Sequence, residues 1–442
     1  MGQICGGLQA VSAGPETPKA SGVRIMSKVL QSDVAIVGGG MVGLSTAIGL
    51  GRAGMSVTVV DRLDAPETTA PAFDGRASAI AYASVRMLEA LGIWQHMAPH
   101  AQPILEIRVS DGTVSRGPGL LHLHFDHRDM KMAGSDPDGP LGHMVENRFT
   151  RIALFKALDE TPNVRLIAPD TVETIHTDKT GTALTLGSGQ RVEAALLLGI
   201  DGRQSQVRAH AGIPSSGCSY KQTGIVCAIA HECDHLGIAH EKFLPSGPFA
   251  ILPLKDRRAS LVWSEKARLA ETIMGLSERA FEAEVRRRVG DFLGDVRVTG
   301  GRWSYPLSMH VAHDFIAERT ALVGDSAHGI HPIAGQGLNL GLRDAAALIE
   351  VLAEAHRLGL DPGGAETLKR YQTWRRSDTV VLAGIMDGLT RLFSNDSKSL
   401  RLARGIGLSV VDRIPPLKRF FISHARGTVG TLPKLLTGET PA

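Results

Sequence analysis

The segment from Asp33 to Asp61 constrains the fold more than any other part of the chain. An apolar run leads into the pattern G-x-G-x-x-G, which consists of Gly38, Gly40 and Gly43; a helical pattern and a second apolar run then follow, ending at Asp61. This order of strand, helix and strand is typical of a dinucleotide-binding unit. We predict that Gly38 forms the tight turn, that Gly40 lets the backbone reach a pyrophosphate, that Gly43 lets the helix pack on the strand, and that Asp61 binds a ribose.

A second glycine-rich segment, from Gly324 to Asn339, follows another short apolar run and precedes a long helical pattern. Its glycines keep side chains away, so that backbone N–H groups at the helix start can approach an anion or a polar ring. Together the two segments predict a flavin site. The candidate catalytic residues, in the loop beside the flavin, are His331, Pro332 and Gln336. The predicted cofactor contacts of this segment are Gly324, Asp325, Gly335, Gly337, Leu338 and Asn339.

Two further segments add predicted cofactor contacts. The apolar run 194–200 ends at Asp201 and Gly202, which indicates a buried parallel strand whose functional edge lies at its C-terminal end. Arg76 precedes an amphipathic helical pattern, so its guanidinium can pair with a cofactor phosphate or can be a solvated charge in a turn. The phosphate interpretation depends on the glycine pattern at the N-terminal end of the chain.

Length, charge and cysteine content limit the class of protein. A chain of 442 residues is longer than most single cores, so we expect two domains or one large α/β domain with an inserted sheet. The net charge of +3 is too small for a strongly basic protein, and we predict no nucleic-acid partner. Four cysteines do not form a disulfide framework in a chain of this length, which favours a reducing compartment.

Two groups of histidines and cysteines suggest metal binding at first sight. His122, His124 and His127 lie in an alternating pattern, which places the first two on one face of a half-exposed strand. Cys227 and Cys233 lie near three histidines, but their spacing is not that of a zinc site. We therefore predict no metal site.

The motifs together resemble the single-component FAD-dependent aromatic hydroxylases, the group that includes p-hydroxybenzoate hydroxylase. They are G-x-G-x-x-G, the strand that ends in Asp201-Gly202, and the pattern G-D-x-x-H-x-x-x-P-x-x-G-Q-G-x-N of residues 324–339. Three other segments are similar to the ubiquinone-biosynthesis hydroxylase family: Asp74-Gly75-Arg76 with the residues after it, the run from His231 to Leu254, and the run from Arg370 to Asp378. The resemblance covers nearly the whole chain from Asp33.

This resemblance implies an FAD cofactor and gives each predicted contact a role. The pyrophosphate would bind at Gly38, Gly40 and Gly43, the adenosine ribose at Asp61, the cofactor phosphates at Arg76 and the ribityl chain at Asp325. The loop 331–339 would lie against the isoalloxazine. Asp201 and Gly202 would lie beside FAD and on the path of nicotinamide.

The resemblance also implies a reaction. The family consists of FAD-dependent monooxygenases that hydroxylate the aromatic ring of a polyprenyl-phenol intermediate in ubiquinone biosynthesis, through a flavin hydroperoxide formed from O2. NADPH, NADH or a protein electron donor would act as reductant. Two alternatives stay open: another flavoenzyme of the same fold, such as a prenyl-chain reductase or a hydroxylase of a small soluble phenol, and a non-catalytic carrier of prenylated ligands.

The predicted fold is α/β, with a Rossmann-like FAD-binding domain, an inserted antiparallel-sheet substrate domain that covers the flavin, and a C-terminal helical region. Residues 112–142 are dense in Gly, Pro and Asp, and we expect them to be irregular. The predicted boundaries are 32–111, 143–215 and 314–394 for the FAD-binding domain, 216–313 for the substrate or lid sheet, 395–442 for a basic C-terminal tail and 1–31 for a disordered extension. The apolar lid residues are Phe243, Phe249, Ile251, Leu252 and Trp263.

Positive charge is concentrated at the C-terminus. Residues 395–442 contain eight Lys and Arg residues but three acidic residues, and apolar residues recur among them at roughly helical spacing. This pattern predicts a segment that holds the protein on an anionic membrane surface, or docks on other quinone-biosynthesis proteins, rather than being part of the catalytic site. No run of eighteen apolar residues is present, so we expect no segment that spans a membrane. With the cysteine content and the basic C-terminus, the expected location is cytoplasmic and peripherally membrane-associated.

Overall fold

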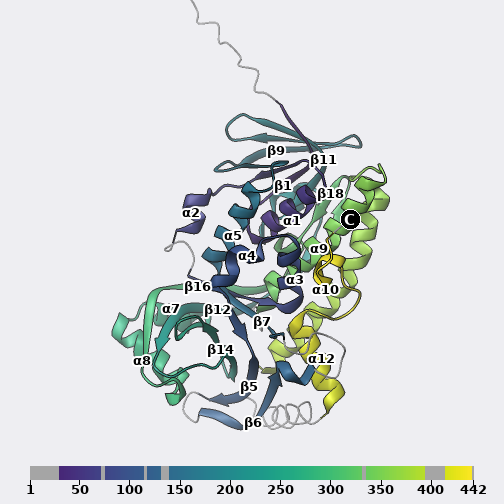
Figure 1. Cartoon of the computed structure of the whole chain (residues 1–442). Helices are drawn as coiled ribbons and strands as arrows, with labels where there is room; N and C mark the ends of the chain where they lie inside the picture. The colour runs from purple at the N-terminus through teal and green to yellow at the C-terminus, as the bar shows by residue number, and fades with distance from the viewer. Residues whose placement is uncertain are drawn as a thin grey trace, which may run out of the picture.

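The computed structural model of the chain describes residues 29–70, 75–113, 117–130, 139–330, 335–393 and 414–440. Within these ranges two large sheets lie one above the other, and helices run along one side of both (Figure 1). Some predictions fall outside the described residues. They concern residues 1–28 of the N-terminal extension, the loop residues His331 and Pro332, and the C-terminal tail as far as residue 413.

The first sheet is built around β1 (Leu30–Val37), the strand of the first glycine-rich segment. Residues 34–37 are buried, and β1 pairs in parallel with two strands, so that Ile36 lies opposite Val59 and Leu198. Apolar strands buried on both faces are typical of a parallel sheet that helices cover. In spatial order the strands are β17 (Ile316–Ala317), β18 (Thr320–Leu322), β11 (Arg191–Gly199), β1, β2 (Val57–Val60) and β8 (Val164–Ile167). In addition, β10 (Thr182–Leu186) pairs antiparallel with β11, and β9 (Val172–Thr177) pairs antiparallel with β10.

Three helices cover this sheet: α1 (Met41–Arg52), α5 (Asn147–Asp159) and α9 (Gln336–Arg357). α1 contacts both of the others, and the three helices share one apolar core with the strands. The predicted strand, helix and strand unit and the α/β fold class are thus confirmed. The short elements beside it are α2 (Ala65–Thr69), α3 (Tyr82–Ala90), α4 (Trp94–Met97), α6 (Gln206–His210), η1 (Ala98–His100), and a small sheet of β3 (Ala77–Ala81), β7 (Gly142–Glu146) and β4 (Gln102–Ile104).

The second sheet lies below the first in Figure 1 and carries α7 (Ala267–Met274) and α8 (Glu278–Val289) on one face. Its neighbouring strands are antiparallel except for the parallel pair β13 (Ile238–Leu244) and β5 (Glu106–Thr113). In spatial order they are β19 (His328–Gly329), β16 (Val296–Ala312), β12 (Ser215–His231), β15 (Arg258–Lys266), β14 (Gly247–Leu254), β13 (Ile238–Leu244), β5 (Glu106–Thr113) and β6 (Gly117–Asp126). Three 3₁₀ turns connect elements: η2 (His127–Met130), η3 (Asp291–Leu293) and η4 (Gly324–Ser326).

The hairpin of β5 and β6 differs from the sequence-based division of the chain. That division ended the FAD-binding segment at residue 111 and expected 112–142 to be irregular, whereas residues 106–113 and 117–126 extend the second sheet. The backbone of β5 pairs with β13, more than a hundred residues later in the chain. Local composition does not reveal a partner so far along the chain, so the glycines and prolines of this segment favoured a loop.

The C-terminal residues return to both sheets. α10 (Ala365–Phe393) runs down the side of the molecule, and α12 (Pro415–Arg426) lies beside β5 and β6 at the lower end (Figure 1). α13 (Lys434–Thr437) places Leu435 and Leu436 in the core of the first sheet. Among the described helices, none has the length and apolar character that crossing a membrane requires.

Candidate active site

A cavity of about 1560 Å³ lies between the two sheets. Ligand pockets of proteins are commonly about 300–1,000 Å³, so this cavity has room for more than one small molecule. Its wall changes character from one end to the other. One end consists of glycine-rich backbone at the edge of the first sheet, and the other consists of apolar side chains from the second sheet and from α12.

The glycine-rich end begins at α1. Gly38 has a φ of +107°, and a Cβ at this position would overlap the backbone of Ile200. A Cβ at Gly43 would overlap the carbonyl oxygen of Gly38, so both positions require glycine for the strand and helix to meet. Gly40 is different: it precedes the first turn of α1, lines the cavity, and a Cβ there would meet no described atom within 4 Å. The first turn of α1 therefore faces open space in the cavity.

The start of α9 lies on the same cavity. Gly335, with a φ of +63°, precedes the helix. Gly337 lies in the first turn, and a Cβ there would again meet no atom of the described residues within 4 Å. Asn339 fixes this turn to β3, because its amide accepts from Ala81 N at 2.8 Å and donates to Ala79 O at 2.8 Å. Two helix N-termini thus share one cavity, and no side chain of the described residues would cover the N–H groups beside Gly40 and Gly337.

The three predicted acidic contacts lie in different settings. Asp61 accepts hydrogen bonds from Gly39 N and from Leu63 N, which places its carboxylate over the glycine turn. Asp201 accepts from the N–H groups of Gln206 and Val207 at the start of α6, and its other carboxylate oxygen is buried without a hydrogen-bond partner among the described residues. Asp325 is exposed and lines the cavity.

Arg203 lies in the turn between β11 and α6 and connects this end of the first sheet to the second sheet. Its guanidinium donates to the backbone and the hydroxyl oxygen of Ser308, both at 2.9 Å, and to Ile330 O at 3.1 Å. Its Nε lies 3.3 Å from a carboxylate oxygen of Asp325. The side chain therefore holds Asp325 and the residues before the flavin loop against β16.

A buried network supports the turn at Gly324 from behind. Asp344 of α9 is fully buried; it accepts from Gly324 N at 3.2 Å, from Arg375 Nε at 2.8 Å, and bonds to His328. Burial alone would raise the pKa of Asp344, but the charges and hydrogen bonds of His328 and Arg375 lower it below its usual value. His328 is therefore a partner of Asp344 and does not belong to the cavity wall.

The other end of the cavity is one face of the second sheet. The expected lid residues divide between its two faces: Phe243 and Leu252 line the cavity, whereas Phe249, Ile251 and Trp263 pack with α7 and α8. The prediction was wrong for these last three because side chains alternate along each strand. The apolar residues of the sheet that line the cavity are Ile107, Val109, Leu123, Phe125, Ala239, Phe243, Ala250, Leu252, Val262 and Pro306.

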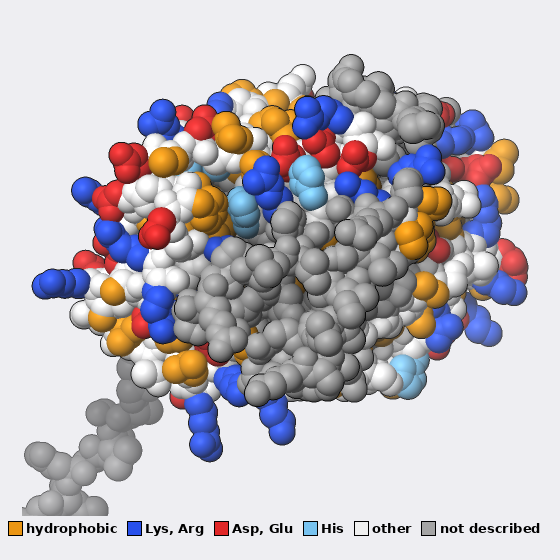
Figure 2. Space-filling view, turned by 90° about the horizontal axis from the view of Figure 1, so that it is seen from below, with side chains coloured by type: hydrophobic (Ala, Val, Ile, Leu, Met, Phe, Trp, Pro, Cys, Tyr) orange, Lys and Arg blue, Asp and Glu red, His pale blue; other side chains and the backbone are white. Residues whose placement is uncertain are grey.

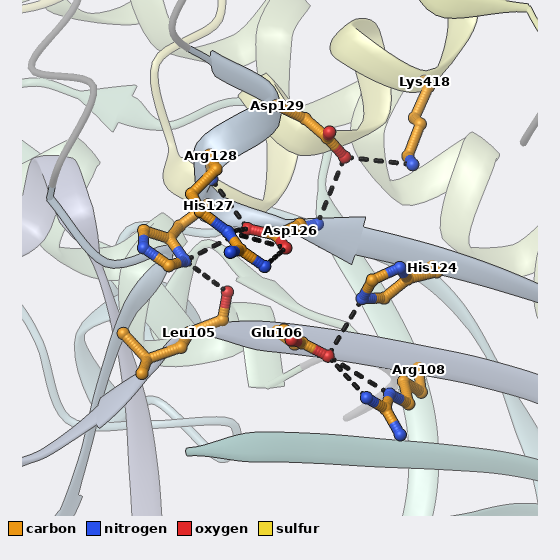
Figure 3. A network of polar contacts seen from close by, with 9 residues as sticks. All are labelled: Leu105, Glu106, Arg108, His124, Asp126, His127, Arg128, Asp129 and Lys418. Atoms are coloured by element: carbon orange, nitrogen blue, oxygen red, sulfur yellow. Dashed lines mark hydrogen bonds and ion pairs between the residues drawn. The ribbon is translucent and has the colours of Figure 1, made fainter. Parts of the chain in front are cut away.

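The hairpin of β5 and β6 also shows this alternation. Its outer face carries Glu106, which pairs with Arg108 at 2.8 Å and with His124 at 2.9 Å (Figure 3). On the same face the hydrogen bonds of Arg128 lower the pKa of Asp126 to about 2. Glu106, His124 and Asp126 lie close enough to share an ion, but arginines already neutralise both carboxylates.

α12 closes the cavity beside this hairpin. Lys418 lies 3.0 Å from Asp129 of η2 (Figure 3), and the rings of Phe125 and Phe421 are 6.5 Å apart. Phe421 and His424 line the cavity. The described part of the C-terminal tail is thus a wall of the candidate site, which corrects the expectation that the tail is separate from it.

Comparison with known proteins identifies the family. Residues 31–380 match the FAD binding domain family. The chain is 46% identical over 422 residues to ubiquinone hydroxylase UbiL from Rhodospirillum rubrum, a match that covers 96% of this chain and 95% of the relative. It is 35% identical over 398 residues to 3-demethoxyubiquinol 3-hydroxylase from Escherichia coli, a match that covers 90% of this chain and 98% of the relative. The chain belongs to the FAD-dependent ubiquinone-biosynthesis hydroxylase family. This hydroxylase is an FAD-dependent monooxygenase.

A solved structure agrees with the fold of the hydroxylase. The p-nitrophenol 4-monooxygenase PnpA from Pseudomonas putida superposes with a TM-score of 0.75 and 19% identity, over 91% of this chain and all of that one. The cavity also fits the FAD that the family binds. Gly40 and Gly337 leave space for a phosphate and a ring at the two helix N-termini, and the cavity has room for a substrate beside the cofactor.

The structure brings most predicted site residues of the hydroxylase to one cavity, although their individual contacts with FAD remain predictions. Gly38, Asp61 and Asp201 lie in the turns behind the wall rather than on it. Two further residues on the cavity, Arg203 and Glu241, belong to no sequence motif that predicts a role for them, and Glu241 interrupts the apolar face of the sheet. The predicted residues that line the cavity are Gly40, Gly43, Arg76, Gly202, Gly324, Asp325, Gly335, Gln336, Gly337, Leu338 and Asn339.

Proposed function

We propose that this hydroxylase adds a hydroxyl group to the aromatic ring of a polyprenyl phenol in ubiquinone biosynthesis. The observation that carries the proposal is the two-ended cavity, in which a glycine-lined site for FAD continues into an apolar chamber. The names of the two relatives, a ubiquinone hydroxylase and a 3-demethoxyubiquinol 3-hydroxylase, support the same substrate class.

The residues of the chain would bind, orient and shield the reactants. FAD, when bound and reduced, supplies the activation of O2. One oxygen atom forms the new bond to a ring carbon, the hydrogen of that carbon leaves as a proton, and the other oxygen atom is reduced to water with two electrons from NADPH, NADH or a protein donor. The apolar face that includes Val109, Phe125 and Leu252 would keep bulk water from the ring.

We also propose that α12 links this cavity to a membrane. Phe421 and His424 line the cavity, whereas Ile414 and Phe420 of the same region are 43% and 48% exposed. Figure 2 looks onto the lower end of the molecule, where hydrophobic side chains border Lys and Arg side chains. A helix of this kind would contact a bilayer peripherally and let the prenyl chain remain in lipid while the ring enters the cavity. Docking on other quinone-biosynthesis proteins would use the same surface.

Isotope labelling tests the proposed reaction. Enzyme with bound FAD, NADPH, ¹⁸O2 and a polyprenyl phenol in vesicles should give a product that carries one ¹⁸O atom on the ring. A small phenol without the prenyl chain should be hydroxylated much more slowly. Reduction of the prenyl chain, or equal turnover of the small phenol, would contradict the proposal.

A further inference from the structure

Glu241 is a carboxyl group on the apolar face of the cavity. It lies in β13, where every second side chain faces the cavity: Ala239, Glu241 and Phe243. The register places Glu241 opposite Val109 of β5 and Ala250 of β14. Apolar side chains therefore flank it on both neighbouring strands.

Lys242, the charged neighbour of Glu241 along β13, reaches the other side of the sheet, whereas His240 also lines the cavity. Lys242 Nζ donates to Arg288 O at 3.2 Å and to Val289 O at 2.8 Å, and the His240 ring packs against Phe292 with centroids 4.6 Å apart. Among the described residues, no hydrogen bond or ion pair involves the Glu241 side chain. Its carboxyl group thus lacks a partner within the described part of the fold.

A carboxyl group in apolar surroundings costs stability unless something binds it. Burial raises the pKa of Glu241 to about 8, so the group is mostly a neutral acid at neutral pH. A neutral carboxyl group both donates and accepts hydrogen bonds, and a phenol hydroxyl also does both. The pair is complementary, and the surrounding aliphatic side chains suit an aromatic ring.

We propose that Glu241 binds the substrate by a hydrogen bond to the oxygen on its aromatic ring, and so orients the ring in the cavity. This inference rests on the proposed function, because it assumes a phenolic ligand. The prenyl chain would lie along the apolar residues of β5, β6 and α12. A purely structural role is a poor explanation, since the side chain stabilises no described element.

Two variants of the FAD-loaded enzyme test the assignment. Glu241→Gln keeps a donor and an acceptor, and Glu241→Leu keeps the approximate size but has neither. The ligands are a phenol with a ten-carbon prenyl chain next to the hydroxyl, and the corresponding prenylbenzene without the oxygen. Dissociation constants are measured from the change in flavin absorbance, and melting temperatures report the fold.

Glu241→Leu should weaken binding of the phenol about 10- to 100-fold, because a buried polar partner is lost. Its affinity for the prenylbenzene should change less than about twofold, and its melting temperature should not fall. Glu241→Gln should stay within about fivefold of the wild type for the phenol. Glu106→Gln, on the outer face of the adjacent strand, is the matched control and should change neither affinity.

The proposal would be overturned if Glu241→Leu lost the same affinity for both ligands. It would also be overturned if Glu241→Leu bound the phenol as tightly as the wild type does. If Glu241→Leu unfolds, the comparison of Glu241→Gln with the wild type decides: a loss of phenol affinity above about tenfold would also count against it. The proposed function fails separately. In that case the wild type binds the phenol through Glu241 but transfers no ¹⁸O to the ring.

Discussion

The two ends of the cavity are built in different ways. At the cofactor end, backbone at the starts of α1 and α9 forms the wall, and glycines provide the space. At the substrate end, side chains from the second sheet and from α12 form the wall. Where backbone must approach a ligand closely, an added side chain would block the contact. Where side chains form the wall, residues can be substituted while the fold is kept. We therefore expect mutations at the two ends to differ in their effects on stability and on FAD binding.

The largest effect should come from the network behind the cofactor end. Asp344→Asn removes the buried carboxylate that His328 and Arg375 share, although Arg375 keeps its pair with the partly exposed Asp378. Loss of one partner of a buried ion pair costs about 3–5 kcal/mol. Urea unfolding measures the change. Asp361→Asn, which affects the partly exposed pair with Arg319, should cost about 1 kcal/mol or less. Similar losses in the two variants would show that Asp344 does not hold the turn.

Gly43→Ala should follow in size. The new Cβ would overlap the carbonyl oxygen of Gly38, so α1 must move away from β1. We expect a loss of about 3 kcal/mol and weak flavin retention. Thermal unfolding with flavin absorbance checks both. A stable yellow variant would mean that the turn is not as tight as the structure has it.

Gly40→Ala should affect the cofactor but not the fold. A Cβ at Gly40 meets no described atom within 4 Å, so the apo protein should unfold as the wild type does. The methyl group would occupy the cavity where the pyrophosphate is expected, and FAD affinity should fall at least about tenfold, or 1.4 kcal/mol. Gly384→Ala, also without close neighbours, is the control and should keep its flavin. Full flavin content in Gly40→Ala would contradict the predicted contact.

At the substrate end, Glu241 should make stability depend on pH. Its pKa is about 8 in the folded protein and 4.5 as its ordinary value, so between these values the folded state binds more protons than the unfolded state. Stability from this group is present below about pH 4.5 and is lost as pH rises toward 8. Glu241→Gln should thus gain stability relative to the wild type as pH rises. A difference in unfolding free energy between the two proteins that stays constant with pH would contradict a raised pKa of Glu241.

Lys418→Met should have the smallest effect. Its pair with Asp129 is partly exposed, and such pairs contribute about 0–1 kcal/mol. Binding to anionic vesicles should decrease slightly, because one positive charge near a surface contributes about 1 kcal/mol. Flotation of the protein with vesicles measures this. An unfolded variant would show that the contact between α12 and η2 carries more of the fold than its geometry suggests.

The sequence predicted the cofactor end well because its constraints are local. The turn between strand and helix sets the spacing of Gly38, Gly40 and Gly43. The apolar pattern of the sequence reveals the strand before these glycines and the helix after them. The predicted fold class and the FAD cofactor are confirmed by the sheet order and by the family match.

The substrate end was less predictable because it depends on distant pairings. Glu241 faces the cavity only through the register of β13 with β5 and β14. The strand register likewise turns Phe249 and Trp263 toward α7 and α8, although their large apolar side chains suited a lid. The placement of α12 against Phe125 depends on a contact between residues almost three hundred positions apart.

A crystal structure of the enzyme with FAD and the prenylated phenol would test the central claim most directly. The claim is that one cavity holds the cofactor on backbone and the phenol on side chains. We predict the pyrophosphate at Gly40 and the start of α1, the flavin ring beside residues 335–338, and the phenol oxygen within hydrogen-bond distance of Glu241. A phenol bound outside this cavity, or FAD bound away from α1, would contradict the account.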